Sequence, residues 1–167
     1  MNNSYNIDKK LILFLILFCG ILNAKSYTID SLWIDSKVST DGSVSISETR
    51  NFSFSGPYSY AYLELRKKYF DSIYDIQVFE NDNIYELADT SGKVSTYIIE
   101  EKKRIYRIKW FFEAQDEERV FTVTYKVDGA LTVGQSDAEL YWPYLYKGRN
   151  KKISSVFISQ SFDEQIY

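Results

Sequence analysis

Hydrophobic and polar residues alternate along most of the chain after residue 27. In residues 44–54, the Val, Ile and Phe side chains share one parity, and Ser, Thr and Asn occupy most of the other. Period-two alternation is typical of a half-buried β-strand. Residues 28–38 follow a similar pattern, and Asp41-Gly42 separates the two segments. An Asp-Gly pair between alternating segments predicts a β-hairpin.

Further segments with strand character follow, and they are listed here: 73–80, 95–100, 104–112, 119–127 and 152–159. Residues 60–69 are compatible with a helix, but we expect a strand because their neighbours are strands. Residues 114–119 are expected to form a charged loop or one helical turn. About nine short strands with little helix are typical of sandwiches and barrels. We predict an all-β fold, an antiparallel β-sandwich of Ig-like architecture, over residues 27–167.

The first 26 residues have the character of a signal peptide. Two lysines precede a run of twelve uncharged, mostly apolar residues, 11–22, and Ala24 and Ser26 lie at the −3 and −1 positions of a cut before Tyr27. The apolar run is shorter than the ~20 residues of a membrane span. An uncleaved signal anchor is the alternative. We therefore expect an exported domain, periplasmic or extracellular, or held at the outer face of the cytoplasmic membrane.

Export changes the chemistry that the chain can use. Cys19 is the only cysteine and lies in the predicted signal, and the sequence contains no histidine. Nucleophilic catalysis of the Cys–His or Ser–His kind and ordinary zinc sites are therefore excluded. Removing residues 1–26, which carry three lysines and one aspartate, lowers the formal net charge from −3 to −5. An acidic domain without a basic stripe is a poor nucleic-acid binder. We expect no cofactor and no metal.

Segment 136–144, SDAELYWPY, combines carboxylates and aromatic rings around a proline. One interpretation is a ligand rim, formed by Asp137, Glu139, Tyr141 and Tyr144. The other is a short strand that buries Leu140 and Trp142, with Asp137 holding the loop through backbone N–H groups. The second is favoured, because large aromatic side chains in sandwiches usually belong to the core.

Glu48 and Arg50 share the parity of the apolar residues in 44–54. A regular strand would carry both charges into the apolar face, where a buried charge requires a partner. We expect a buried ion pair between them. The alternative is that a bulge or the rim of the sheet places Glu48 in a pocket.

Several segments together resemble a known family. They are Thr40–Glu48 with its Asp-Gly turn, Phe54–Gly56, Trp110, Phe121–Val127 and Asp137–Trp142. The combination is similar to the extracytoplasmic N-terminal domain of the YciQ-like predicted membrane proteins, a family of bacterial and archaeal proteins with unknown function. The resemblance covers essentially all of residues 27–160.

The resemblance implies a signal peptide, a β-sandwich outside the membrane, then transmembrane helices and a cytoplasmic tail. It implies no catalytic residues. The downstream transmembrane part is missing here, so the chain is expected to be either a truncated product or a free-standing exported version. An Arg-Asp pair that the family usually carries after the Gly56 turn is replaced by Leu63-Glu64.

Three hypotheses of function follow. The first is a non-enzymatic module that binds or senses an envelope protein or glycan, contacting the membrane only through its signal or a missing downstream part. The second is a carbohydrate-binding or glycoside-cleaving sandwich, which for cleavage needs two carboxylates about 5 Å or roughly 6.5–9.5 Å apart. The third is an interaction module that pairs through an exposed strand edge.

Overall fold

The computed structural model describes residues 25–90, 92–135, 137–146 and 151–163. Twelve strands and one short 3₁₀ helix occupy these residues, where about nine strands were predicted. In chain order they are β1 (Ser26–Val38), β2 (Val44–Ser55), β3 (Pro57–Arg66), η1 (Lys67–Tyr69), β4 (Ser72–Glu80), β5 (Asn83–Ile84), β6 (Glu86–Leu87), β7 (Thr96–Glu101), β8 (Ile105–Gln115), β9 (Glu118–Asp128), β10 (Leu131–Val133), β11 (Ala138–Leu140) and β12 (Ile153–Phe162). The all-β prediction is confirmed.

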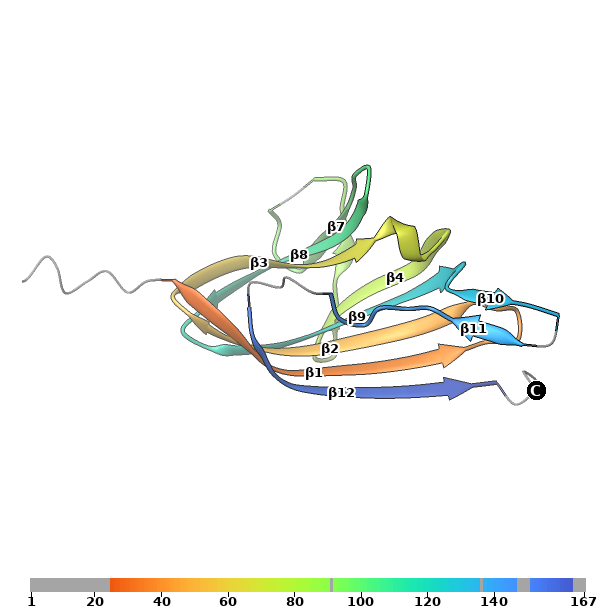
Figure 1. Cartoon of the computed structure of the whole chain (residues 1–167). Helices are drawn as coiled ribbons and strands as arrows, with labels where there is room; N and C mark the ends of the chain where they lie inside the picture. The colour runs from red at the N-terminus through yellow and green to blue at the C-terminus, as the bar shows by residue number, and fades with distance from the viewer. Residues whose placement is uncertain (1–24, 91, 136, 147–150, 164–167) are drawn as a thin grey trace, which may run out of the picture.

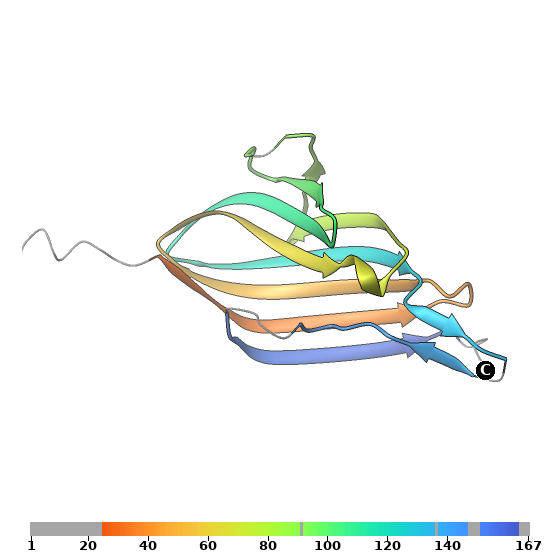
Figure 2. The same cartoon turned by 45° about the horizontal axis from the view of Figure 1, so that its top comes forward.

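Two sheets carry the fold, and they face each other (Figure 1). The larger sheet has the order β12-β1-β2-β9-β4-β5, and the smaller one has the order β3-β8-β7-β6. In Figure 2, β3 and β8 run above the larger sheet, and β12 forms its outer edge. The strands β10 and β11 form a separate two-stranded sheet.

The prediction of a purely antiparallel sandwich is wrong for two strand pairs. β12 pairs with β1 in parallel, with Trp33 opposite Phe157, and β6 pairs with β7 in parallel. A parallel pair needs a long crossover, and the chain between β1 and β12 passes through both sheets first. Because this pairing is between the two ends of the domain, local alternation carried no signal for its direction.

The core lies between the two sheets and is rich in aromatic rings. Phe121 of β9 packs against Phe112 of β8, with ring centroids 4.7 Å apart, and against Trp110 at 5.7 Å. Phe54 of β2 reaches Phe112 at 5.3 Å. Every second residue of β2 from Val44 to Phe54 is buried. The alternation in the sequence therefore predicted the inward face of this strand correctly.

Local predictions had mixed outcomes. The expected strand in 60–69 is present as β3, and its last three residues form η1 instead. The expected loop or helical turn over 114–119 is wrong, because β8 continues to Gln115 and β9 begins at Glu118. Asp116 takes a positive φ of 51° and closes this tight hairpin. Its short polar side chain tolerates the left-handed conformation, and its Oδ1 accepts a 2.6 Å hydrogen bond from the Gly56 N–H.

Residues 1–24 of the predicted signal lie outside the described residues. In the part of the chain that is described, no helix has the length and apolar character that crossing a membrane requires.

Candidate ligand-binding cleft

The charged pair on the apolar face of β2 is buried, as predicted. The Arg50 Nη2 atom lies 2.5 Å from Glu48 Oε2, and the two side chains are only 5% and 4% exposed. Tyr125, on the neighbouring strand β9, donates its hydroxyl proton to Glu48 Oε1 at 2.7 Å. Burial, followed by the nearby Glu48 carboxylate, raises the pKa of Tyr125 well above its ordinary value. The carboxylate is therefore satisfied by two partners from two strands.

Arg50 is not completely satisfied. Its Nε atom is buried and has no hydrogen-bond partner among the described residues. Most buried polar groups in folded proteins are paired, so an orphan N–H of a guanidinium is unusual. Arg50 also lines a cleft of about 570 Å³, which lies between β1 and β2 on one side and the edge strand β3 on the other.

Three cation–π pairs, each between a basic side chain and a tyrosine ring, line this cleft. The Lys25 ammonium lies 4.1 Å from the ring centroid of Tyr58, and the Arg66 guanidinium lies 5.2 Å from that of Tyr146. A third pair, in which Lys151 lies 4.9 Å above Tyr27, completes the set. All six residues line the cleft. A cation over a ring face is held by the ring quadrupole and keeps its charge available to a ligand.

Positive charges outnumber negative ones in the lining of the cleft, whereas the chain as a whole is acidic. Among the described lining residues, Glu64 is the only carboxylate, against the four cations Lys25, Arg50, Arg66 and Lys151. Glu48 pairs with Arg50 and is not part of the lining. The described cleft therefore contains no pair of carboxylates of the kind that glycoside cleavage uses. Its described lining combines cationic side chains with aromatic rings.

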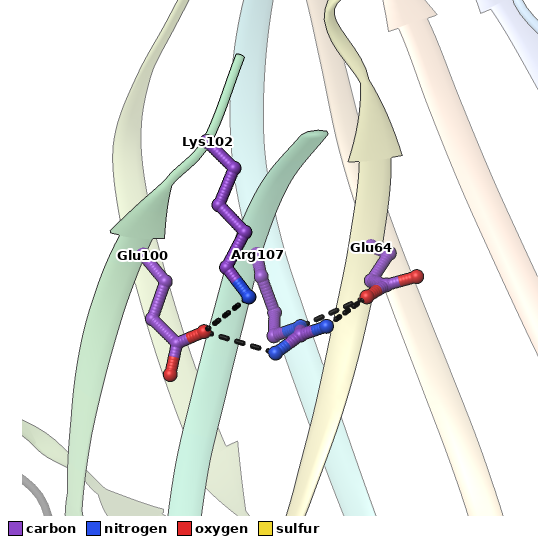
Figure 3. A network of polar contacts seen from close by, with 4 residues as sticks. All are labelled: Glu64, Glu100, Lys102 and Arg107. Atoms are coloured by element: carbon purple, nitrogen blue, oxygen red, sulfur yellow. Dashed lines mark hydrogen bonds and ion pairs between the residues drawn. The ribbon is translucent and has the colours of Figure 1, made fainter. Parts of the chain in front are cut away.

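The Glu64 carboxylate, on β3, already accepts a hydrogen bond from an arginine. Arg107 of β8 donates from Nε to Glu64 Oε1 at 2.9 Å and from Nη1 to Glu100 Oε2 of β7, also at 2.9 Å. Figure 3 shows this bridge, with Lys102 approaching Glu100 at 3.7 Å. The hydrogen bond and charge of Glu64 raise the pKa of Arg107. At the position where the resemblance implies an Arg-Asp pair, Leu63 is buried and Glu64 accepts a cross-strand arginine.

The four residues of the possible ligand rim are placed apart from this cleft. Asp137 and Glu139 are exposed, on either side of the start of β11. Tyr141 is exposed and packs against Tyr69 at 5.5 Å, whereas the Tyr144 hydroxyl lies 2.5 Å from Ser36 Oγ of β1. The two tyrosines therefore contact different elements, and none of the four residues lines the cleft.

The structural interpretation of the same segment agrees with the packing. Trp142 is buried between Phe70 and Tyr125, at centroid distances of 6.1 and 6.2 Å, and Leu140 packs partly buried against the core. The backbone oxygen of Asp137, rather than its carboxylate, accepts the N–H of Gly134 at 2.8 Å.

Among the residues of the cleft, sequence reasoning singled out Arg50 as part of a buried ion pair and Leu63-Glu64 as a departure from the family pattern, and it assigned none of them to a ligand site. The tyrosines and the other cations come from segments far apart in the chain, and each alone is an ordinary surface residue. The signal that was available in the sequence is Arg50 itself, a charged residue at an apolar position of β2.

Comparison with known protein families shows to which family the chain belongs. Residues 28–161 match the family described as "Predicted membrane protein (DUF2207) N-terminal domain". The chain belongs to this family. No curated protein matches it. Among solved structures, a candidate protease from Parabacteroides distasonis is similar at 6% identity and a TM-score of 0.35, and the match covers 61% of this chain and 23% of that one.

Proposed function

We propose that this chain is the exported, non-enzymatic binding domain of a YciQ-like membrane protein, and that the Arg50 cleft holds an acidic glycan of the cell envelope. Membership of a family of membrane-protein N-terminal domains supports a position beside a membrane. The predicted signal over residues 1–26 supports export of residues 27–167.

Arg50 carries the proposal, because it lines the cleft and its buried Nε has no hydrogen-bond partner among the described residues. A guanidinium offers donors in a fixed fork that matches a carboxylate or phosphate. A ligand oxygen that reached this N–H would satisfy a donor that otherwise remains desolvated without a partner. The orphan donor thus supports a ligand that brings its own anionic oxygen.

The tyrosines define the rest of the ligand. Ligand sites combine apolar and aromatic walls with a few polar groups that fix orientation. Tyr58, Tyr60 and Tyr62 follow one another along β3 at the cleft, and Arg66 and Lys151 add charge to its lining. Alternating rings and cations suit a chain of sugar rings that carries acidic groups.

Titration calorimetry tests the proposal with two probes, an oligogalacturonate and a neutral malto-oligosaccharide of the same length. We expect the acidic probe alone to bind. Arg66→Ala should weaken its binding roughly tenfold, because a charge-assisted contact contributes about 1.5–3 kcal/mol. Lys109→Ala is the matched control, since Lys109 lies 4.2 Å from the Tyr60 ring but does not line the cleft.

Equal binding of both probes, or binding unchanged by Arg66→Ala, would contradict the acidic-ligand proposal. Release of shorter oligosaccharides that is lost when one carboxylate is changed would contradict the non-enzymatic one.

Fractionation of the native host, with N-terminal sequencing of the product, tests export. A cut before Tyr27 removes Lys25 and Ser26, and it leaves the new α-amino group beside the cleft in place of the Lys25 charge. Recovery of the full-length chain in the cytoplasm would contradict export. A larger product in the membrane would place this domain in a longer protein.

A further inference from the structure

The edge strand β12 lacks the features that usually protect a sheet edge. Its ten residues, ISSVFISQSF, contain no charged residue and no proline. One edge of β12 pairs with β1, and its other edge pairs with no strand among the described residues. A long strand of this kind offers a row of free N–H and C=O groups to another strand.

The edge strands at the other three edges of the two main sheets each have a feature that disfavours pairing. β5 and β6 are only two residues long, which leaves little to pair with. β3 begins at Pro57, has an irregular register between Tyr58 and Tyr60, and carries Glu64. Short strands, prolines, bulges and charges are the usual devices against edge pairing. Among these four edge strands, β12 alone lacks all of them.

β12 also exposes apolar side chains. Its four large apolar side chains after Ile153 are each between 37% and 49% exposed: Val156, Phe157, Ile158 and Phe162. Phe157 stacks on Trp33 of β1, with ring centroids 4.0 Å apart and planes inclined by 15°. Trp33 is itself 49% exposed. The stack therefore forms an apolar row that ends at the open edge.

We propose that β12 pairs with β12 of a second copy of this chain, antiparallel and centred on Phe157. The charges at the two ends of the strand select this partner and direction. Lys151 and Lys152 precede β12. Asp163, which also pairs with Lys37 of its own chain at 2.7 Å, and Glu164 follow it in the sequence. An antiparallel pair brings the basic start of each strand to the acidic end of the other, whereas a parallel pair would bring like charges together.

The proposed register gives each exposed group a partner. Residues directly opposite in an antiparallel pair share a face, so the two Phe157 rings meet. The Trp33–Phe157 stack of each copy then continues into that of the other, in one row of four rings. Ser155 of each copy lies opposite Ser159 of the other, and the two six-stranded sheets become one continuous sheet.

Sedimentation equilibrium of the purified exported chain tests the pairing at roughly 10–100 µM, the range in which a weak specific dimer is populated. We expect a dimer. Phe157→Lys places two like charges opposite each other and should raise the dissociation constant by about tenfold or more. Mixing Phe157→Lys with Phe157→Glu should restore a mixed dimer. Ile84→Lys, at the opposite edge of the same sheet, is the matched control and should leave the dimer intact.

A second pair of variants keeps every apolar contact. Ser155 and Ser159 are both exposed. In the proposed register, Ser155→Lys with Ser159→Lys gives two repulsive pairs, and Ser155→Lys with Ser159→Glu gives two attractive ones. The first should be monomeric and the second dimeric. A wild-type monomer throughout the concentration range, or two variants with equal dissociation constants, would overturn the proposal.

Discussion

The chain carries two arginine–glutamate networks that differ in their burial. Arg50 and Glu48 lie inside the sandwich on one strand, with side chains about one-twentieth exposed. Arg107 bridges Glu64 and Glu100 across three strands on the outside, with its side chain 24% exposed. The residue types are the same, but the solvent around them is different.

This comparison separates what an ion pair contributes from what its loss costs. At the surface, water replaces a missing partner and salt screens the charges, so each pair is worth little. Inside, the desolvated partner that remains has no replacement, and removing one member costs much more than the pair contributes. Tyr125 and Arg50 together cover the Glu48 carboxylate, so that each change there leaves an unpaired group.

Glu48→Gln should have the largest effect of the changes that compare the two networks. The amide keeps the shape of the carboxylate but leaves the Arg50 charge buried and uncompensated, at a cost of about 3–5 kcal/mol. Urea unfolding followed by circular dichroism measures this loss. Glu117→Gln, at an exposed turn, is the control and should change the free energy of unfolding little. A loss below about 1 kcal/mol for Glu48→Gln would place this network with the surface one.

Tyr125→Phe should rank second. It keeps the ring between the sheets and removes only the hydroxyl that donates to Glu48 Oε1. An unpaired buried acceptor costs about 1–3 kcal/mol. The same urea experiment measures this loss. Tyr141→Phe, which makes the same change at an exposed tyrosine, is the control. A stability equal to that of the wild type would show that the carboxylate finds another donor.

The stability at alkaline pH should also depend on the Tyr125 hydroxyl. The folded state holds the pKa of Tyr125 well above 10.0, the ordinary value, so the unfolded chain loses this proton first as pH rises. The contribution of Tyr125 to the free energy of unfolding is therefore present in full below pH ~10. Above that pH it falls by roughly 1 kcal/mol per pH unit. Thermal unfolding between pH 8 and 11 measures the decline.

The Tyr125→Phe variant should show a shallower decline above pH ~10 than the wild type. A slope remains, because burial also raises the pKa of Tyr85 and Tyr97. Identical slopes for the two proteins would mean that Tyr125 ionises equally easily in the folded chain.

Glu64→Gln should have the smallest effect, within about 1 kcal/mol, because its partner Arg107 keeps Glu100 and contact with water. The difference from the wild type should shrink further in 1 M salt, whereas the loss in Glu48→Gln should persist. Urea unfolding at low and high salt compares them. A large, salt-independent loss in Glu64→Gln would show that the outer network is as desolvated as the inner one.

The sequence predicted features that depend on a residue and its close neighbours. The alternation in β2 placed Glu48 and Arg50 inside, and Asp41-Gly42 marked the hairpin between β1 and β2. It did not predict the tight hairpin at Asp116, because the charged residues around it suggested a loop. It predicted the burial of Arg50 but no ligand site around it, since Lys25, Arg66 and Lys151 are neighbours only after folding.

The sequence by itself determined the all-β class and the inward faces of the strands, because the side-chain period of a strand is a local property. The tertiary structure alone decided the rest. It decided that β12 runs parallel to β1, that Tyr144 turns toward Ser36 while Tyr141 stays exposed, and that four distant cations surround one cleft. These outcomes depend on which distant strands come together, and non-local pairing leaves no periodic signal in the chain.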